Sequence, residues 1–424
     1  MEEFQKYTVI SADCHAGAEI STYRRYLEAE WHSEFDDWVN AFSDPWVSVD
    51  ADPAEFTIGV ASASSSANWD SGQRMRQLED DGIVAEVIFP NTTPPFFPSG
   101  VFTAAAPSSR REYERRWAGL RAHNRWLAEF CSDVPGRRAG VAQVFLNDVD
   151  DAVAEVRWAK EAGLTGGILL PADSLVQLAP VYHASYDPLW AVCAELGMPV
   201  HRHASLPGDP TVEGDPAITA IGLIEGRFFT RRALAHLVFG GVFDRFPTLM
   251  FVLTEAGIEW VPAHLRELDA VYGSARMDGT LANTFAGAAA NALRRRPSEY
   301  LATNCYLGAS FMSAAEAPVS RQIGVDRVMW GSDYPHSEGT YPFSIQALQM
   351  AFGSMTYAET RSILTDTPAT VYGFDRQALE HVADRVGPRV DAVHGAPMPV
   401  PRFPEESLSP AFSGAVATGR LPQS

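Results

Sequence analysis

Residues 7–15 read Tyr-Thr-Val-Ile-Ser-Ala-Asp-Cys-His, an apolar and β-branched run that ends in two side chains able to bind a metal. Such a run is typical of a buried strand. Seven further apolar runs also end in polar or ligand-capable residues; they are 85–89, 140–146, 166–170, 198–203, 249–253, 300–307 and 328–330. Stretches with helical spacing lie between them, for example 149–162, 188–196, 228–239 and 315–323. This alternation predicts an α/β fold with a parallel sheet, and eight units predict a (β/α)8 TIM-like barrel.

A doubly wound sheet is the competing fold, but it needs a glycine-rich phosphate loop after its first strand, and residues 13–17 are not one. Two segments fall outside the repeat. Residues 18–77 are rich in Trp, Asp and Ser and are predicted to be an insertion after the first strand. Residues 387–424 are rich in proline and are predicted to form an arm that packs on this or a neighbouring subunit, or is disordered. We therefore expect a barrel domain at 1–386 and an arm at 387–424.

The charge and the cysteine content narrow the function classes. The 424 residues carry 33 basic and 53 acidic side chains, a net charge of −20, which repels phosphate backbones and anionic lipid. No apolar run reaches the roughly 18 residues of a membrane span, and the acidic start is not a signal peptide. Four widely spaced cysteines without a CxxC pair indicate reduced thiols. The composition predicts a cytoplasmic enzyme for a small molecule, with no nucleic-acid or membrane partner.

The polar residues at the strand ends are of the types that bind divalent metals. Asp13 and His15 lie two residues apart, so both side chains point to the same side of their strand. The carboxyl ends of barrel strands meet at one mouth, and imidazoles and carboxylates converging there form a metal-ligand set. The predicted ligands are Asp13, His15, His201, His203, Glu255, Asp333 and His336.

A structural explanation must be weighed against this one. A single inward histidine is more often a hydrogen-bonded core residue than a ligand. Several buried carboxylates without a cation, however, cost several kcal/mol each. No lysine or arginine occupies the other strand ends apart from Arg202, which should point outward. The set as a whole therefore favours a metal site.

The loop at 90–98 contains four prolines and two threonines around two phenylalanines and is apolar and stiff. It is either a packed loop or one wall of a hydrophobic substrate pocket. The residues predicted to contact substrate are Asn91, Phe96, Phe97, Trp260 and Tyr334.

Four motifs resemble the amidohydrolase superfamily: Asp-Cys-His at 13–15, Pro-Val-His-Arg-His at 199–203, Gly-Val-Phe-Asp-Arg-Phe-Pro at 241–247 and Gly-Ser-Asp-Tyr-Pro at 331–335. The resemblance spans about residues 6–375 and is strongest to the branch of the aminocarboxymuconate-semialdehyde and γ-resorcylate decarboxylases. It implies a barrel with a divalent metal at its mouth. It also implies that Asp13 and His15 are first-strand ligands, that His203 is the fifth-strand ligand, and that Asp333 binds metal or handles protons.

One position departs from that branch, because Glu255 stands where the decarboxylases have a histidine at the end of the sixth strand. The seven potential ligands exceed what one tetrahedral zinc needs, so they suit two metals, with iron, manganese and zinc all compatible. Carboxylate-rich, imidazole-containing shells also serve di-iron oxygen chemistry. In this respect the sequence resembles the amidohydrolase-fold, non-haem di-iron hydroxylases of platensimycin and platencin biosynthesis, which act on diterpenoid CoA thioesters.

Three chemistries fit these residues. The favoured prediction is an O2-dependent hydroxylase, or monooxygenase, with two Fe, acting on a bulky hydrophobic carboxylate or CoA thioester, with Asp333 and Glu255 as catalytic groups. The alternative is a Zn- or Mn-dependent hydrolase or non-oxidative decarboxylase of a small carboxylated substrate. A catalytically inactive barrel would have lost ligands, and this chain has a surplus. We further expect a homodimer.

Overall fold

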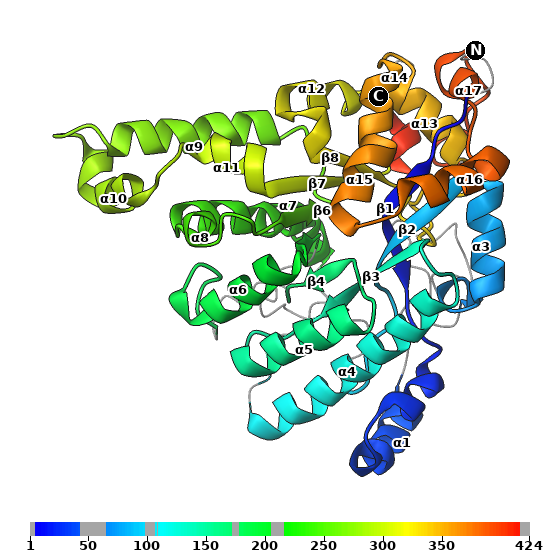
Figure 1. Ribbon diagram of the computed structural model, residues 1–424, viewed down its shortest axis with the longest axis horizontal. Coiled ribbons are helices and arrows are strands. Elements are labelled where there is room, and N and C mark those ends of the chain that lie inside the picture. Colours follow the sequence, from blue (N-terminus) through cyan, green and yellow to red (C-terminus); the bar gives the residue numbers. More distant parts are fainter. Residues whose placement is uncertain are drawn as a thin grey trace.

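The computed structural model describes residues 5–42, 65–97, 107, 109–171, 178–204 and 216–415. Its eight strands form one parallel sheet in chain order (Figure 1). They are β1 (Val9–Ala16), β2 (Ile83–Pro90), β3 (Arg138–Gln143), β4 (Gly167–Leu169), β5 (Val200–His203), β6 (Phe251–Thr254), β7 (Cys305–Ser310) and β8 (Val328–Gly331). Helices flank the strands, so the predicted (β/α)8 barrel is confirmed.

The barrel closes where β8 meets β1. The backbone N–H of His15 donates to the carbonyl of Tyr334 at 2.7 Å, and that of Asp333 donates to the carbonyl of Asp13 at 2.8 Å. The strands approach so closely here that a Cβ on Gly331 would lie 2.5 Å from the Cβ of Asp13. Glycine is required at that position, and the closure brings the ends of the first and last strands together at the mouth.

Sixteen helices are assigned within the described ranges. They are α1 (His32–Ala41), α3 (Ser71–Asp80), α4 (Arg110–Ser132), α5 (Val149–Glu161), α6 (Asp187–Leu196), α7 (Pro216–Phe239), α8 (Val242–Arg245), α9 (Val261–Ala275), α10 (Leu281–Ala292), α11 (Pro297–Asn304), α12 (Ser320–Ile323), α13 (Ser344–Phe352), α14 (Tyr357–Arg361), α15 (Thr367–Tyr372), α16 (Arg376–Val386) and α17 (Val390–His394). In Figure 1, α9 and α10 extend away from the barrel. No helix among the described residues combines the length and the apolarity needed to cross a membrane.

The seventh strand begins later than predicted. Residues 300–304, which were expected to open it, belong to α11, and β7 begins at Cys305. Pro297 occupies the first turn of α11, and the Glu299 carboxylate accepts from the backbone N–H of Arg296 at 2.8 Å, so this helix start is fixed locally. The helix expected at 315–323 is also shorter, with only α12 and a preceding single 3-10 turn (Ala317–Val319).

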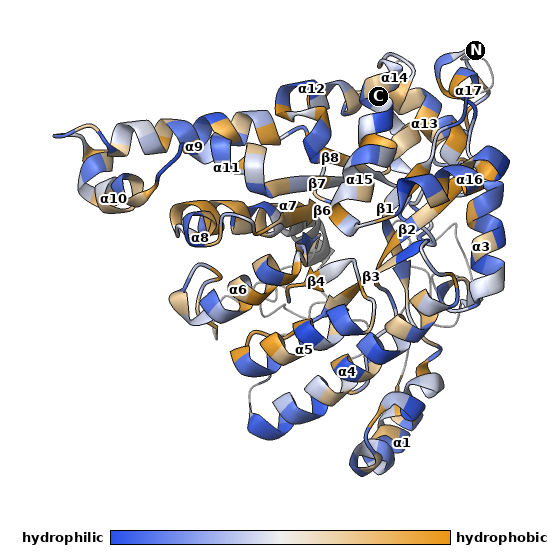
Figure 2. Ribbon diagram, viewed as in Figure 1, coloured by the Kyte–Doolittle hydropathy of each residue, from blue (hydrophilic) through white to orange (hydrophobic). Residues whose placement is uncertain are grey.

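The barrel interior is apolar below the mouth, and Val371 and Tyr372 of α15 close its lower end. Apolar residues of the strands and of the inner helix faces appear orange in Figure 2, whereas the outer faces of α4 and α5 are largely blue. The buried layer comprises Ala12, Val87, Ala139, Val141, Val252 and Met329. The candidate ligands Asp13, His203 and Asp333 lie above this layer, at or just after the carboxyl ends of their strands.

The segment between β1 and β2 contains a 3-10 helix (Ile20–Tyr26), α1 and α3, while residues 43–64 of the predicted insertion lie outside the described residues. The proline-rich arm, as far as residue 415, packs on the same chain. Ala411 and Phe412 lie against Ala347 of α13, and the backbone N–H of Tyr7 donates to the carbonyl of Pro388 at 2.9 Å. The proposed domain division and the dimer stay predictions.

Candidate metal centre

The end of β1 carries a β-bulge that contains Asp13 and precedes His15. From Ser11 to Cys14 β1 advances three residues, whereas β2 advances two, from Glu86 to Ile88. A bulge bends a strand and re-aims its side chains, and bulges are frequent beside active sites. The side chains of Asp13 and His15 meet in one group of ligand atoms, and the thiol of Cys14 points away, toward Ser11.

Five predicted ligands lie at the mouth, from β1, β5 and the residues after β8. Asp13 Oδ1 lies 3.3 Å from His15 Nε2 and 3.3 Å from His203 Nε2. The same His15 nitrogen lies 3.2 Å from Asp333 Oδ1. Ligand atoms of Asp13, His15 and His203 all lie within 4.8 Å of one another, and those of His15, Asp333 and His336 do so as well. Each set joins groups from two strand ends, and His15 belongs to both sets.

Hydrogen bonds at the far ring nitrogens orient two of the histidines. His15 Nδ1 lies 3.1 Å from the carbonyl oxygen of Pro90, to which it donates, and this leaves Nε2 directed at the carboxylates. His336 Nε2 lies 3.1 Å from Asn91 Oδ1, and its Nδ1 lies 2.9 Å from Asp333 Oδ1. The Asn91 amide donates in turn to Asn68 Oδ1 at 2.6 Å. Asn91 thus holds a histidine of the centre, and its contact with substrate stays a prediction.

Several buried atoms at this point lack hydrogen-bond partners among the described residues. They are His15 Nε2, both carboxylate oxygens of Asp333, and His336 Nδ1. His15 Nε2 and His336 Nδ1 lie 3.2 Å and 2.9 Å from Asp333 Oδ1, as ion-pair neighbours. Buried polar groups are almost always satisfied, so atoms of ligand type left over at one spot indicate a missing partner. A divalent cation bound by carboxylate and imidazole matches this donor set.

The ionisation of these groups reflects their burial and mutual attraction. Burial opposes ionisation of Asp13, yet the imidazoles of His203 and His15 hold its pKa well below the usual range. The pKa of Asp333 is also lowered against burial, by His336 and His15. Burial raises the pKa of Glu255 to about 8, with Asp333 and Asp13 adding to the shift and His203 opposing it. The buried negative charge at the mouth requires nearby positive charge, which protonated imidazoles or a metal supplies.

A second group of acids adjoins the histidines. Carboxylate oxygens of Glu255, Asp333 and Glu338 lie within 4.8 Å of one another, and Glu255 Oε2 lies 3.4 Å from His203 Nδ1. Glu255 and Asp333 have φ angles of 57° and 60°, a left-handed conformation that non-glycine residues rarely adopt away from functional sites. Sequence reasoning missed Glu338. Its position, five residues after Asp333 in the same loop, was the available signal.

His201 is not brought to this centre, which corrects the prediction that it is a ligand. Its Nε2 donates to the carbonyl of Gly166 at 2.8 Å, and its ring stacks on Tyr372 at the closed end of the barrel. Burial lowers its pKa to about 3, so it is neutral. The physical reason is depth. Two residues along a strand advance about 6.6 Å, so His201 lies one layer below His203 even though both point inward.

The two phenylalanines of the 90–97 loop are packed, and the prediction that they form an open pocket wall is not met. Phe96 lies among Trp31, Phe35 and Trp38, with ring centroids about 6 Å apart. Phe97 stacks on Phe145 at 5.8 Å. Both are almost fully buried. Large aromatic rings bury more apolar area against each other than a polar mouth offers, which favours packing. Pro98 lies outside the described residues.

Trp260 and Tyr334 also serve packing in this structure. The indole N–H of Trp260 donates to the backbone carbonyls of Ala256 and Gly257, which fixes the start of α9. Tyr334 is buried, donates through its hydroxyl to Gln77 of α3, and lies beneath the guanidinium of Arg74. The ring therefore points toward α3.

One further group touches the centre and was not predicted. The Ser310 hydroxyl, at the end of β7, donates to Asp13 Oδ2. Because the predicted seventh strand ended at residue 307, its true last residue was not recognised as a strand end. Placing β7 correctly would have revealed it.

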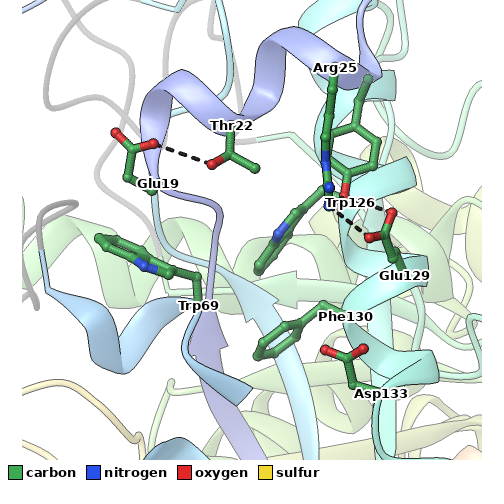
Figure 3. A pocket seen from close by; sticks show the side chains of 9 residues that line it. Glu19, Thr22, Arg25, Trp69, Trp126, Glu129, Phe130 and Asp133 are labelled. Atoms are coloured by element: carbon green, nitrogen blue, oxygen red, sulfur yellow. Dashed lines mark hydrogen bonds and ion pairs between the residues drawn. The ribbon is translucent and has the colours of Figure 1, made fainter. Parts of the chain in front are cut away.

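A separate cavity of about 190 Å3 lies beside α4, with Trp69, Trp126 and Phe130 among its lining residues (Figure 3). The ion pair of Arg25 with Glu129, 2.7 Å, borders it. It contains none of the predicted ligands, so it is distinct from the metal centre.

The sequence matches the amidohydrolase family over residues 90–374, about two thirds of the chain. The chain belongs to the amidohydrolase family. The matched range contains His203, Glu255 and Asp333, whereas Asp13 and His15 precede it and are placed by the structure. A γ-resorcylate decarboxylase from Rhodococcus jostii is 27% identical over 288 residues, which cover 64% of this amidohydrolase and 82% of that protein.

Solved structures of other amidohydrolases share the fold. An amidohydrolase from Mycobacterium avium subsp. paratuberculosis superposes with a TM-score of 0.63 at 20% identity, covering 87% of this chain and 100% of that one. The 5-carboxyvanillate decarboxylase from Sphingomonas paucimobilis superposes with a TM-score of 0.61 at 22% identity, covering 87% of this chain and 100% of that one. The dihydroxybenzoic acid decarboxylase from a Polaromonas species was solved with bound manganese. It superposes with a TM-score of 0.57 at 19% identity, covering 88% of this chain and 99% of that one. The relatives support a metal-dependent enzyme. They lend no support to iron, a monooxygenase or antibiotic biosynthesis, so the decarboxylase alternative fits better than the favoured hydroxylase.

Proposed function

We propose that this amidohydrolase is a metal-dependent, non-oxidative decarboxylase of a small carboxylated substrate. One observation carries the proposal: His15 Nε2 and the two Asp333 oxygens are buried without hydrogen-bond partners among the described residues, at the point where Asp13 and His203 converge. The γ-resorcylate decarboxylase from Rhodococcus jostii suggests the class of substrate, because γ-resorcylate is a hydroxylated benzoate. A phenolic aromatic acid is therefore the first substrate class to test.

Asp13, His15, His203 and Asp333 would hold the metal, with His336 beside them. A bound divalent cation supplies Lewis-acid stabilisation of anionic oxygen on the substrate. Loss of carbon dioxide leaves the electron pair of the broken bond on a substrate carbon, so a proton must reach that carbon. We assign its delivery to Asp333 or Glu255, whose carboxyl groups follow β8 and β6 at the mouth. The Asn91 amide keeps His336 oriented.

The test is CO2 release under strict anaerobiosis by protein loaded with Mn2+. The candidate substrates are 2,6-dihydroxybenzoate and 5-carboxyvanillate. We expect one CO2 per aromatic product, abolished by EDTA and restored by Mn2+. Asp333→Asn is expected to lose turnover while it stays folded. Turnover that requires O2, or turnover unchanged in the EDTA-treated protein, would refute the proposal.

A second candidate function is the O2-dependent hydroxylation of a bulky carboxylate or thioester at a dinuclear, di-iron site. The specific observation in its favour is the acid group of Glu255, Asp333 and Glu338, a third set of ligand atoms at the mouth that shares Asp333 with one of the two histidine-containing sets. Carboxylate-rich shells of this kind serve di-iron proteins of other folds. Two iron ions per chain and substrate-dependent O2 uptake would favour it, whereas one metal per chain and no O2 uptake favour the decarboxylase. Hydrolysis would use the same groups and is distinguished by its products.

A further inference from the structure

Arg74 is a fully buried cation in α3, within the segment between β1 and β2. Its Nε and Nη2 donate to the carboxylate of Glu86 at 2.6–3.0 Å, and its Nη1 donates to the carbonyls of His15 at 2.7 Å and Ala67 at 3.0 Å. Glu86 lies on β2 between Val87 and Ala85, on the side away from the barrel interior lined by Val87. The guanidinium is thus paired and hydrogen-bonded, and it lies outside the barrel interior against the backbone of His15.

The same guanidinium touches the chain next to two proposed ligands that come from different strands. It bonds the carbonyl of His15 itself, and its Cζ lies 4.8 Å from the ring centroid of Tyr334, the residue after Asp333. The backbone N–H of His15 donates to the carbonyl of Tyr334 at 2.7 Å. Arg74 therefore contacts both sides of the backbone hydrogen bond between His15 and Tyr334, which joins the strand ends that carry His15 and Asp333.

We propose that Arg74 is a positioning residue for the metal centre, through which the segment after β1 sets the geometry of His15 and Asp333. The proposal rests on the metal dependence of the proposed function but not on the reaction catalysed. Groups outside the ligand shell that orient ligands commonly change metal affinity about 10–100-fold when they are removed. Lysine cannot replace this arginine, because one ammonium lacks the planar fork that reaches Glu86 and the His15 carbonyl together.

Arg138 offers a matched control. It also pairs with Glu86, through Nε at 3.1 Å, and it is almost as buried. Its Nη1 donates to the carbonyl of Phe130 at 2.7 Å and to Ser71 Oγ at 2.8 Å. Removing either arginine leaves Glu86 neutralised by the other, but only Arg74 contacts the ligand backbone. Both variants therefore remove one arginine from the same ion network, but only the Arg74 variant loses a hydrogen bond to the backbone of a proposed ligand.

The experiment compares Arg74→Met with Arg138→Met in the full chain, using Mn2+ as the probe. The dissociation constant for Mn2+ is measured by competition with a chelator, and the free energy of unfolding is measured on metal-free protein. We expect both variants to lose stability, but only Arg74→Met to bind Mn2+ at least about tenfold more weakly than wild type. If Arg74→Met does not fold, Arg74→Lys is compared with Arg138→Lys under the same expectation.

Equal Mn2+ affinity in the wild type and the Arg74 variant would overturn the inference, and so would equal losses of affinity in the Arg74 and Arg138 variants. A wild-type chain that binds no Mn2+ would overturn the proposed function as well. Tight binding by the wild type and by both variants would overturn the role of Arg74 alone.

Discussion

His15 Nδ1 lies 3.1 Å from the carbonyl oxygen of Pro90, and this contact joins the ends of β1 and β2 and fixes the tautomer of the imidazole. A ring that donates from Nδ1 presents the lone pair of Nε2, and that nitrogen faces the carboxylates of Asp13 and Asp333. The arrangement is that of a metal-binding histidine whose second nitrogen is held by the backbone. The ligand is therefore oriented before any metal arrives.

The two histidines of β5 should behave differently when they are replaced. His203→Ala removes a nitrogen beside Asp13, so we expect Mn2+ affinity to fall by more than about 100-fold, since even outer partners are worth about 10–100-fold. His201→Leu loses the hydrogen bond to Gly166 inside the barrel and should cost about 1–3 kcal/mol of unfolding free energy while metal is retained. Metal analysis and denaturant unfolding of both proteins provide the measurement. Equal metal loss in the two variants would restore His201 as a ligand.

The positions of the strand-end ligands follow from the sequence. The two-residue period of a strand places Asp13 and His15 on one face, and the parallel barrel brings them to the side of His203 and Asp333. The alternation of side chains along a strand does not tell how deep in the barrel each inward side chain lies. For that reason His201 was predicted to be a ligand at the mouth, although it lies one layer below His203. Contacts such as that of Ser310 with Asp13 join residues 297 positions apart, and they depend on strand register that the local pattern does not contain.

The aromatic loop shows a second limit of the sequence. Phe96 and Phe97 follow β2 at the correct end of the barrel, but whether such rings line a cavity or pack together depends on partners from α1 and α4. Arg74 illustrates the same point for charge. A basic residue in a polar insertion is expected to be solvated, and only its pairing with Glu86 shows that Arg74 is a buried cation.

Ser310→Ala should weaken metal binding without unfolding the barrel. The hydroxyl donates to Asp13 Oδ2, and its removal leaves that buried oxygen without this donor, which loosens the carboxylate. We expect Mn2+ affinity to fall about tenfold. Chelator competition provides the measurement, with Ser320→Ala as the control, because Ser320 is also buried but donates to the carbonyl of Ala317. Similar affinities in the two variants would show that Ser310 has no part in the centre.

The buried carboxyl group of Asp81 should make the free energy of unfolding depend on pH. It is buried at the end of α3, accepts from the backbone N–H of Ser344 at 3.0 Å, and has a pKa raised by burial to about 7. Between pH of about 4, where the unfolded acid ionises, and about 7, the folded protein holds a proton that the unfolded chain has released. This group therefore makes unfolding free energy fall as pH rises through that window, by up to about 4 kcal/mol.

Asp81→Asn is expected to remove that slope, whereas Asp80→Asn, at the adjacent exposed position, should keep it. Urea unfolding at half-unit steps from pH 4 to 8 measures the difference. Parallel profiles for the wild type and Asp81→Asn would refute the assignment.

Glu255→His tests the acid that departs from the decarboxylase pattern. If one metal is held by Asp13, His15, His203 and Asp333, the variant should still bind one Mn2+ per chain, and it should release CO2 under anaerobiosis if Asp333 is the group that delivers the proton. If Glu255 instead bridges toward Glu338 in a dinuclear site, the variant should lose one of two metals and all O2-dependent turnover. Elemental analysis together with an O2 electrode separates the two results.

The location of the bound metal tests the central claim most directly. Crystals of the full chain grown with Mn2+ and measured at wavelengths on either side of the manganese absorption edge would locate the ion by its anomalous difference. The account predicts one strong peak coordinated by Asp13, His15 Nε2, His203 Nε2 and Asp333, with His201 still bonded to Gly166. No peak at that point, or a peak held by Glu255 and Glu338 without the histidines, would contradict it.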